Sequence, residues 1–300
     1  MRPVITENSS NSNQNYLCWV CGSTRQFILR ESIRGIPLSS SMFRITDAHY
    51  GQTGSIYQCQ ECGFRQCNDL EQVLNFYEQL EDKDYEASRA ERAIQARRIL
   101  QTVSVYRPSG RLLDIGAGSG ILVEEAQKLG YIAQGIEPSK WLCDKAIERE
   151  LSVHHGTLPH MNINPPYDVI TLIDVIEHVS NPVELLRNIH QLMAKESIGI
   201  VVTPDVGSLT ARLMGYHWWH YRIAHIGYFN QKTLNLALVN ANLRLLFFLR
   251  PKWYFSMPYL IKRINIYLPR LFHLPVFKWM EHITIPLNLF DSILVVFTKE

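Results

Sequence analysis

A glycine-rich turn between an apolar strand and a helix constrains this 300-residue chain more than any other segment. Residues 112–120 read Leu-Leu-Asp-Ile-Gly-Ala-Gly-Ser-Gly, and a helical pattern begins at Ile121. Glycine adopts backbone conformations that other residues avoid, so such a loop lets the backbone approach a ligand closely at the start of a helix. The spacing G-x-G-x-G differs from the G-x-G-x-x-G of dinucleotide sites, which disfavours a dinucleotide oxidoreductase, and no phosphate-binding lysine follows it.

Two acidic residues accompany this loop. Asp114 precedes the first glycine, and Glu137 ends the next apolar strand, residues 131–136. A carboxylate before the loop would repel a pyrophosphate and suits a cationic, amino-bearing ligand. A carboxylate at the tip of the second strand is placed to accept hydrogen bonds from two ribose hydroxyls. The pattern therefore predicts a nucleoside pocket at the carboxyl edge of a parallel sheet.

This arrangement resembles the class I, Rossmann-like S-adenosylmethionine-dependent methyltransferases over roughly residues 85–250. Residues 167–179 are similar to the fourth-strand motif of that family, and residues 198–204 to its fifth strand. The resemblance implies an α/β fold with a mostly parallel seven-stranded sheet and helices on both faces. It also implies that the cofactor contacts Asp114, Gly116, Ala117, Gly118, Gly120, Glu137, Pro138, Thr157, Leu158, Asp174 and Val175. Many relatives have an acid in place of Thr157.

Four of the six cysteines form two C-x-x-C-G motifs, at residues 18–22 and 59–63. Two such motifs provide the tetrahedral thiolate set that zinc prefers, and disulfides are rare in a reducing compartment. Cys67 is expected to be a spectator thiol, with replacement of one ligand as the alternative. The expected ligands of a zinc ion are Cys18, Cys21, Cys59 and Cys62.

A module of this kind before such a domain resembles the sugar C-methyltransferases that act on nucleotide-linked deoxysugars, and related bacterial methyltransferases. In that group the module helps to close over the substrate, and Tyr77 and Tyr85 either cover the pocket or pack within a helical linker. The expected organisation is a disordered segment 1–15, a zinc module 16–70, a helical linker 71–103, a cofactor-binding domain 104–250, a cap or membrane-surface insertion 251–290, and a last strand 291–300.

Candidate catalytic residues lie in the loop after the fourth strand and in an aromatic segment, residues 215–229. The three histidines of that segment lack H-E-x-x-H spacing and any nearby acid, which disfavours a metal site. We expect His225, whose ordinary pKa lies near neutrality, to be the general base, Tyr228 to assist it, and His178 to be the reserve. The alternatives are that His225 only packs the segment against the sheet and that His178 is held by backbone contacts.

Charge restricts the partners of the chain. The formal net charge of +2 gives no case for nucleic-acid binding. Residues 250–282 carry six basic residues against one acid, interleaved with aromatics. This composition suits contact with a membrane surface, an anionic substrate, or the solvated rim of a cap. The N-terminus has no apolar signal segment, and no uncharged apolar stretch reaches the ~18 residues of a membrane span, so we expect a cytoplasmic protein, with peripheral contact at the inner face of the membrane as an option.

The sequence thus predicts an S-adenosylmethionine-dependent methyltransferase with a small-molecule acceptor. The expected acceptor is a sugar or sugar nucleotide in polysaccharide or secondary-metabolite biosynthesis. One alternative is an O-methyltransferase for a lipid-linked or isoprenoid acceptor at the membrane surface. Another is a non-catalytic, zinc-bearing protein that binds S-adenosylmethionine. The oligomeric state is left open.

Overall fold

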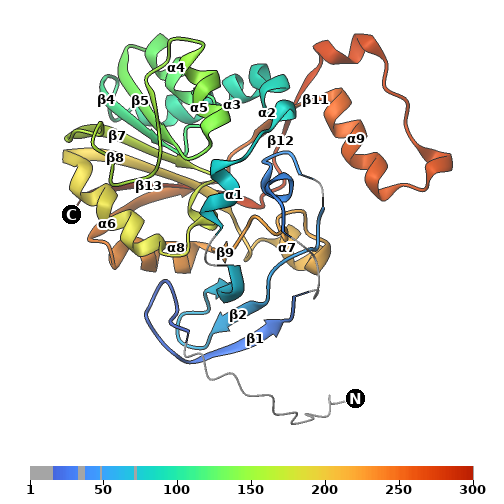
Figure 1. Cartoon of the computed structure of the whole chain (residues 1–300), viewed down its shortest axis with the longest axis horizontal. Coiled ribbons are helices and arrows are strands. Elements are labelled where there is room, and N and C mark those ends of the chain that lie inside the picture. The colour runs from blue at the N-terminus through green and yellow to red at the C-terminus, as the bar shows by residue number, and fades with distance from the viewer. Residues whose placement is uncertain (1–15, 33–37, 48, 71–72, 300) are drawn as a thin grey trace.

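A seven-stranded sheet organises most of the chain in the computed structural model, which describes residues 16–32, 38–47, 49–70 and 73–299 (Figure 1). The strand order is β10-β13-β8-β7-β4-β5-β6, and β13 runs antiparallel to its two neighbours. The predicted Rossmann-like fold with a mostly parallel sheet is therefore confirmed. The segment 1–15, predicted to be disordered, lies outside the described residues. The strands are β4 Gly110–Ile115, β5 Tyr131–Glu137, β6 Val153–His155, β7 Tyr167–Ile173, β8 Met193–Pro204, β10 Leu243–Leu249 and β13 Ser292–Lys299.

Helices cover both faces of this sheet, because successive strand residues face opposite sides. In β4, Leu112 packs into the core beneath one set of helices and Leu113 into the core beneath the other. Figure 1 shows α3, α4 and α5 on one face and α6 and α8 on the other. These helices are α3 Arg89–Ser104, α4 Ile121–Lys128, α5 Lys140–Ile147, α6 Pro182–Leu192 and α8 Gln231–Val239.

Local sequence signals set where several of these helices begin. The Ser139 side chain accepts a hydrogen bond from the Leu142 amide and caps α5. Asn181 caps α6, whose first residue is Pro182, a position where the missing amide proton costs no hydrogen bond. Each capped helix follows a loop at the carboxyl edge of the sheet, so the caps also fix the loops that surround the pocket.

The N-terminal module has a small sheet of its own, with strand order β1-β2-β3-β9. Its fourth strand, β9, comes from the aromatic segment 215–229 and pairs antiparallel with β3. The module is therefore joined by backbone hydrogen bonds to the segment that was expected to hold catalytic residues. The elements are β1 Gln26–Arg30, β2 Ile56–Cys59, β3 Arg65–Gln66 and β9 Gly227–Tyr228, followed along the chain from β3 by the linker helices α1 Leu74–Glu78 and α2 Lys83–Ala87.

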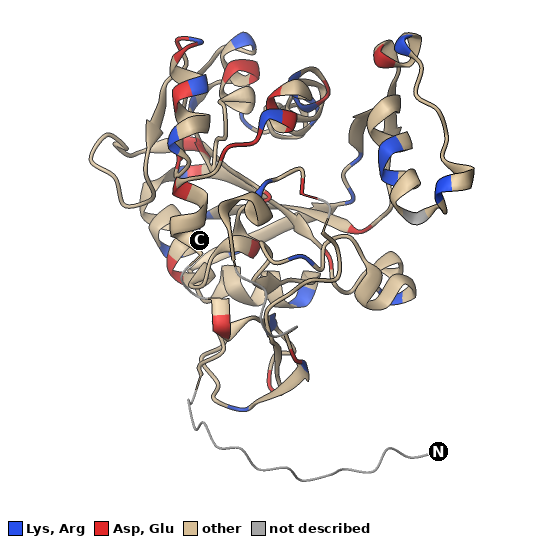
Figure 2. Cartoon of the chain, turned by 45° about the vertical axis from the view of Figure 1, so that its right-hand side comes forward, with Lys and Arg blue, Asp and Glu red and all other residues tan. Residues whose placement is uncertain are grey.

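A two-stranded ribbon and a helix project from the sheet between β10 and β13 (Figures 1 and 2). The ribbon pairs β11, Trp253–Ser256, with β12, Thr284–Leu287, and α9, Met257–Tyr267, follows β11. A further short helix, α7, covers Leu209–Met214. Within the described ranges, no helix combines the length and apolar character needed to cross a membrane.

The packing of β8 against β13 gives a stability prediction at Gly199. Gly199 pairs with Phe297, and a Cβ built at this glycine would lie 2.1 Å from the ring of Phe297. The ring is fully buried, so Gly199→Ala should lower the free energy of unfolding by about 1–3 kcal/mol. Urea denaturation measures this, and adding Phe297→Leu to the variant should restore part of the loss. An unchanged urea midpoint for Gly199→Ala would contradict this packing.

Candidate active site

A cavity of about 590 Å³ lies where β4, β5 and β7 end. This is the edge at which open α/β sheets bind ligands. Gly120, also expected at the cofactor, does not line it: this residue is the N-cap of α4, and a Cβ there would lie 2.7 Å from Leu151. The other predicted cofactor residues all line the cavity, namely Asp114, Gly116, Ala117, Gly118, Glu137, Pro138, Thr157, Leu158, Asp174 and Val175.

The glycine loop is held to the second strand by the side chain of Glu137. Its Oε2 accepts a hydrogen bond of 2.8 Å from the Gly118 amide, and its Oε1 accepts one of 2.8 Å from the Ser139 amide. Gly118 has a φ of +55°, and a Cβ there would lie 2.5 Å from the hydroxyl of Tyr85. Both the conformation and the close approach therefore require glycine at this position.

The carboxyl groups of Asp114, Glu137 and Asp174 line this edge of the cavity, and those of Asp114 and Glu137 are buried. Burial raises the pKa of Asp114 to about 7 and that of Glu137 to about 7, although hydrogen bonds to each favour the charged form. Burial also raises the pKa of Asp174 to about 6. Removing a carboxylate from water costs free energy unless a partner replaces the water. These groups are therefore suited to a ligand that brings a cation and hydroxyl donors.

The linker before α3 also reaches the cavity. Both Tyr77 and Tyr85 line it, and Arg92 lies over the ring of Tyr85 at 4.2 Å. The hydroxyl of Tyr77 lies 2.6 Å from Nδ1 of His178. The placement is compatible with tyrosines that cover a bound ligand.

The two predicted histidines meet in the cavity. The ring centroids of His178 and His225 are 4.9 Å apart, and Nδ1 of His178 lies 2.7 Å from the carbonyl oxygen of Ala224. Burial lowers the pKa of His178 to about 4 and lowers the pKa of His225 well below its ordinary value. The near-neutral ordinary pKa, on which the choice of His225 as base relied, is therefore lowered in the fold, because the chain buries the imidazole away from water. A base of this kind accepts a proton less readily than free imidazole.

Tyr228 was expected to assist His225, but the structure separates it from the cavity. It is buried on β9, and it is not among the described residues that line the cavity. Its ring lies 5.1 Å from that of Tyr221. Tyr228 pairs with Arg65 of β3. This pairing fixes which side of the small sheet the Tyr228 side chain faces, since neighbouring residues of a strand face opposite sides.

Sequence reasoning missed a pairing of His220 with Asp291. His220 lines the cavity, and its Nε2 lies 3.5 Å from Oδ2 of Asp291, which also accepts a 3.2 Å hydrogen bond from the Trp218 indole. Burial acts to raise the pKa of Asp291, but the hydrogen bond and charge of His220, together with the hydrogen bond from Trp218, outweigh it and hold the pKa below its ordinary value. One feature of the sequence could have indicated this acid beside the histidines. An antiparallel last strand begins at the edge where the parallel strands end, and Asp291 directly precedes that strand.

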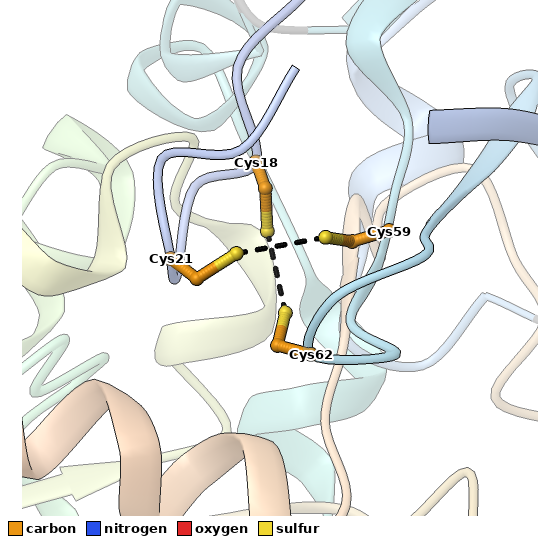
Figure 3. A group of neighbouring side chains, drawn as sticks. All are labelled: Cys18, Cys21, Cys59 and Cys62. Atoms are coloured by element: carbon orange, nitrogen blue, oxygen red, sulfur yellow. Dashed lines mark hydrogen bonds between the residues drawn. The ribbon is translucent and has the colours of Figure 1, made fainter. Parts of the chain in front are cut away.

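The four cysteines of the two C-x-x-C-G motifs converge in the N-terminal module (Figure 3). Sγ of Cys18 lies 3.5 Å from Sγ of Cys62, Sγ of Cys21 lies 3.5 Å from Sγ of Cys59, and all four sulfur atoms lie within 4.8 Å of one another. A disulfide would need ~2.05 Å, whereas a tetrahedron with ~2.3 Å metal–sulfur bonds has edges of ~3.8 Å. The arrangement therefore fits a four-coordinate metal. Cys67 is buried elsewhere and is not in this group.

The raised pKa of Asp114 gives a prediction for the unliganded protein. Between the ordinary pKa of 3.8 and the folded-state value of about 7, the folded protein holds a proton that the unfolded chain has lost. The contribution of this group to stability therefore falls as the pH rises through that window. Asp114→Asn should flatten the decline in the free energy of unfolding, measured by urea denaturation from about pH 5 to 8. Asp84→Asn, at an exposed carboxylate, should leave it unchanged, and equal slopes in the wild type and Asp114→Asn would refute the assignment.

Comparison with known proteins identifies the family. Residues 86–246, more than half of the chain, match a family described as a methyltransferase domain. The ubiquinone biosynthesis O-methyltransferase of Caulobacter sp. (strain K31) is 33% identical over 101 residues, which are 31% of this chain and 40% of that protein. The enzyme of the same name from Haemophilus ducreyi is 29% identical over 100 residues, or 29% of this chain and 42% of that protein, so the matched segment spans less than half of either relative.

Among solved structures, this chain is similar to one chain of the complex between the Haloferax volcanii Trm112 methyltransferase activator and the putative methyltransferase. The match covers 73% of this chain and 98% of the chain in that complex. Its TM-score is 0.50 at 12% sequence identity, a likeness that concerns the fold alone. The family match, the sheet order and the glycine-loop cavity agree with one another. The chain therefore belongs to the class I S-adenosylmethionine-dependent methyltransferases.

Proposed function

We propose that this enzyme transfers a methyl group from S-adenosylmethionine to a hydroxyl group of a sugar or sugar nucleotide. The observation that carries the proposal is the cavity itself, which joins the cofactor edge of the sheet to the His220–Asp291 pair, in which Asp291 is buried. On the acceptor side the cavity is lined by the aromatic residues of β11 and by Arg222. In the structure as described, Nε of Arg222 is buried and has no hydrogen-bond partner, which suits a hydroxyl or phosphate oxygen of the acceptor.

When bound, S-adenosylmethionine supplies a methyl group already activated on a sulfonium sulfur. The residues of the chain then have two tasks, alignment of the acceptor and exclusion of water. Glu137 would accept hydrogen bonds from the ribose, and Asp114 and Asp174 would hold the cationic part of the cofactor. His220 would take the acceptor proton at Nδ1 as the new carbon–oxygen bond forms and the methyl–sulfur bond breaks, which leaves S-adenosylhomocysteine, and Asp291 would stabilise the resulting imidazolium at Nε2. His225 and His178 remain neutral beside it, in keeping with the lowered pKa of each.

The second candidate acceptor is a phenolic or isoprenoid hydroxyl. The names of the sequence relatives favour it, since they are ubiquinone biosynthesis O-methyltransferases. The apolar cavity wall formed by Trp253, Tyr254 and Phe255 also accommodates such a group. Formation of S-adenosylhomocysteine from a panel of nucleotide-linked sugars and short isoprenoid phenols distinguishes the two.

The base assignment predicts different effects for histidines that lie close together in sequence. His220→Ala and Asp291→Asn should lower kcat by about 10²–10⁴-fold and leave the affinity for S-adenosylhomocysteine, measured by calorimetry, nearly unchanged. His217→Ala is the matched control, because His217 is exposed in the same segment. A larger loss of kcat in His225→Ala than in His220→Ala would return the role of base to His225.

We also propose that Cys18, Cys21, Cys59 and Cys62 bind one structural zinc ion. The sulfur geometry and the all-cysteine ligand set support zinc, because closed tetrahedral thiolate sites are structural. We retain with it the expected division of the chain into a zinc module 16–70, a linker 71–103, a cofactor-binding domain 104–250, an insertion 251–290 and a last strand 291–300. The zinc stabilises the small sheet, and β9 transmits that order to the histidine-bearing segment.

Metal analysis tests this proposal directly. The purified protein should contain about one zinc per chain, and Cys59→Ser combined with Cys62→Ser should remove it and loosen the module, since metal binding and folding are coupled there. Turnover should fall as well, because β9 leads out of the segment that holds His220. Cys67→Ser should keep the metal. Zinc retained by the double variant, or lost from Cys67→Ser, would overturn the ligand set.

A further inference from the structure

The projecting part of the insertion, residues 257–283, has an apolar surface that nothing in the described chain covers. We call these residues the arm. Residues 269–279 are exposed without interruption, and within the arm no described side chain is buried. Leu271 is 88% exposed and Trp279 is 61% exposed. The large apolar side chains exposed in the arm are Ile264, Ile266, Leu271, Phe272, Leu274, Val276, Phe277 and Trp279.

The arm keeps a defined shape without a core of its own. Asn265 holds the loop that follows α9, because its side chain donates to the Leu274 carbonyl and accepts from the Leu274 amide. The amide of Met257 donates to the carbonyl of Ile283 and closes the base of the arm. Soluble proteins rarely expose a contiguous apolar surface of this size unless it binds something. The structure therefore points to an external partner.

The charges of the arm indicate the chemistry of that partner. Lys262, Arg270 and Lys278 are exposed among the apolar side chains, and Glu281 is the one acidic residue of residues 257–283. Figure 2 shows the basic positions along α9 and the loop that follows it. A second copy of the chain on a two-fold axis would place this positive surface against itself. A surface of anionic lipids instead offers negative headgroups above an apolar layer, which matches cations interleaved with apolar side chains.

We propose that the arm docks the enzyme on an anionic lipid bilayer. The base of the arm supports this, because Tyr259 of α9 and the neighbouring β11 residues Trp253, Tyr254 and Phe255 line the acceptor side of the cavity. Docking therefore brings the cavity toward the headgroup layer, where a glycosyl group carried on a lipid can enter it. This choice of acceptor rests on the proposed methyltransferase function, whereas the docking itself does not.

Vesicle sedimentation with the full-length, metal-loaded protein tests the docking. The wild type should bind vesicles of mixed phosphatidylglycerol and phosphatidylcholine, bind poorly to phosphatidylcholine alone, and dissociate as salt is raised. Replacing Leu271, Phe272 and Phe277 together by Ser should lower the partition coefficient about 10-fold or more, and replacing Lys262, Arg270 and Lys278 together by Glu should do the same. The matched controls are the triple Ser variant of exposed Ile132, Met161 and Val105, and the triple Glu variant of exposed Lys195, Lys232 and Arg244; both should bind like the wild type.

Three outcomes would overturn the proposal. They are equal vesicle binding by the wild type and both arm variants, equal binding to neutral and anionic vesicles, and a wild-type dimer in solution that the arm variants dissociate. Calorimetry with S-adenosylhomocysteine on the same proteins separates this proposal from the proposed function. Arm variants should keep the wild-type affinity, and a wild type that binds vesicles but not S-adenosylhomocysteine would refute the function and leave the docking intact.

Discussion

The site depends on one carboxylate held between two backbone amides. Glu137 ends β5 and accepts hydrogen bonds from Gly118 in the glycine loop and from Ser139 at the cap of α5. These bonds fix the loop, the strand end and the helix start relative to one another. They also keep the carboxylate buried at the edge of the cavity, where burial raises its pKa to about 7. This edge of the cavity is therefore a consequence of how β4 and β5 and the helices that follow them are joined.

The rest of the candidate site is assembled by long-range strand pairing. Because β13 is antiparallel, it begins where β8 ends, and Asp291 arrives beside His220. Because β9 pairs with β3, the segment that holds the histidines is attached to the cysteine-bearing module. Three parts of the chain that are distant in sequence thus meet around the acceptor side. A change at the four cysteines is therefore expected to reach the histidines through these strand pairs.

Burial of ionisable groups lowers the stability of the folded protein at this site. Asp114, Glu137 and Asp174 have raised pKa values, and His178 and His225 have lowered ones, all because water is excluded. Such groups destabilise an empty pocket and gain partners when a polar ligand enters. The cavity is in this sense prepared for a ligand that carries a cation, hydroxyls and a transferable proton.

The sequence alone determined the local elements and the edge of the sheet at which the cavity lies. The glycine spacing, Asp114, Glu137 and the paired cysteine motifs identified the fold class, the cavity and the convergent thiols, because strands, caps and tight turns depend on neighbouring residues. Only the tertiary structure decided which distant side chains meet. The order of β10 and β13 at the sheet edge brought Asp291 to His220, and pairing with β3 turned Tyr228 away from the cavity. Burial depth, which depends on the whole fold, lowered the pKa of His225 where its ordinary chemistry predicts a base near neutrality.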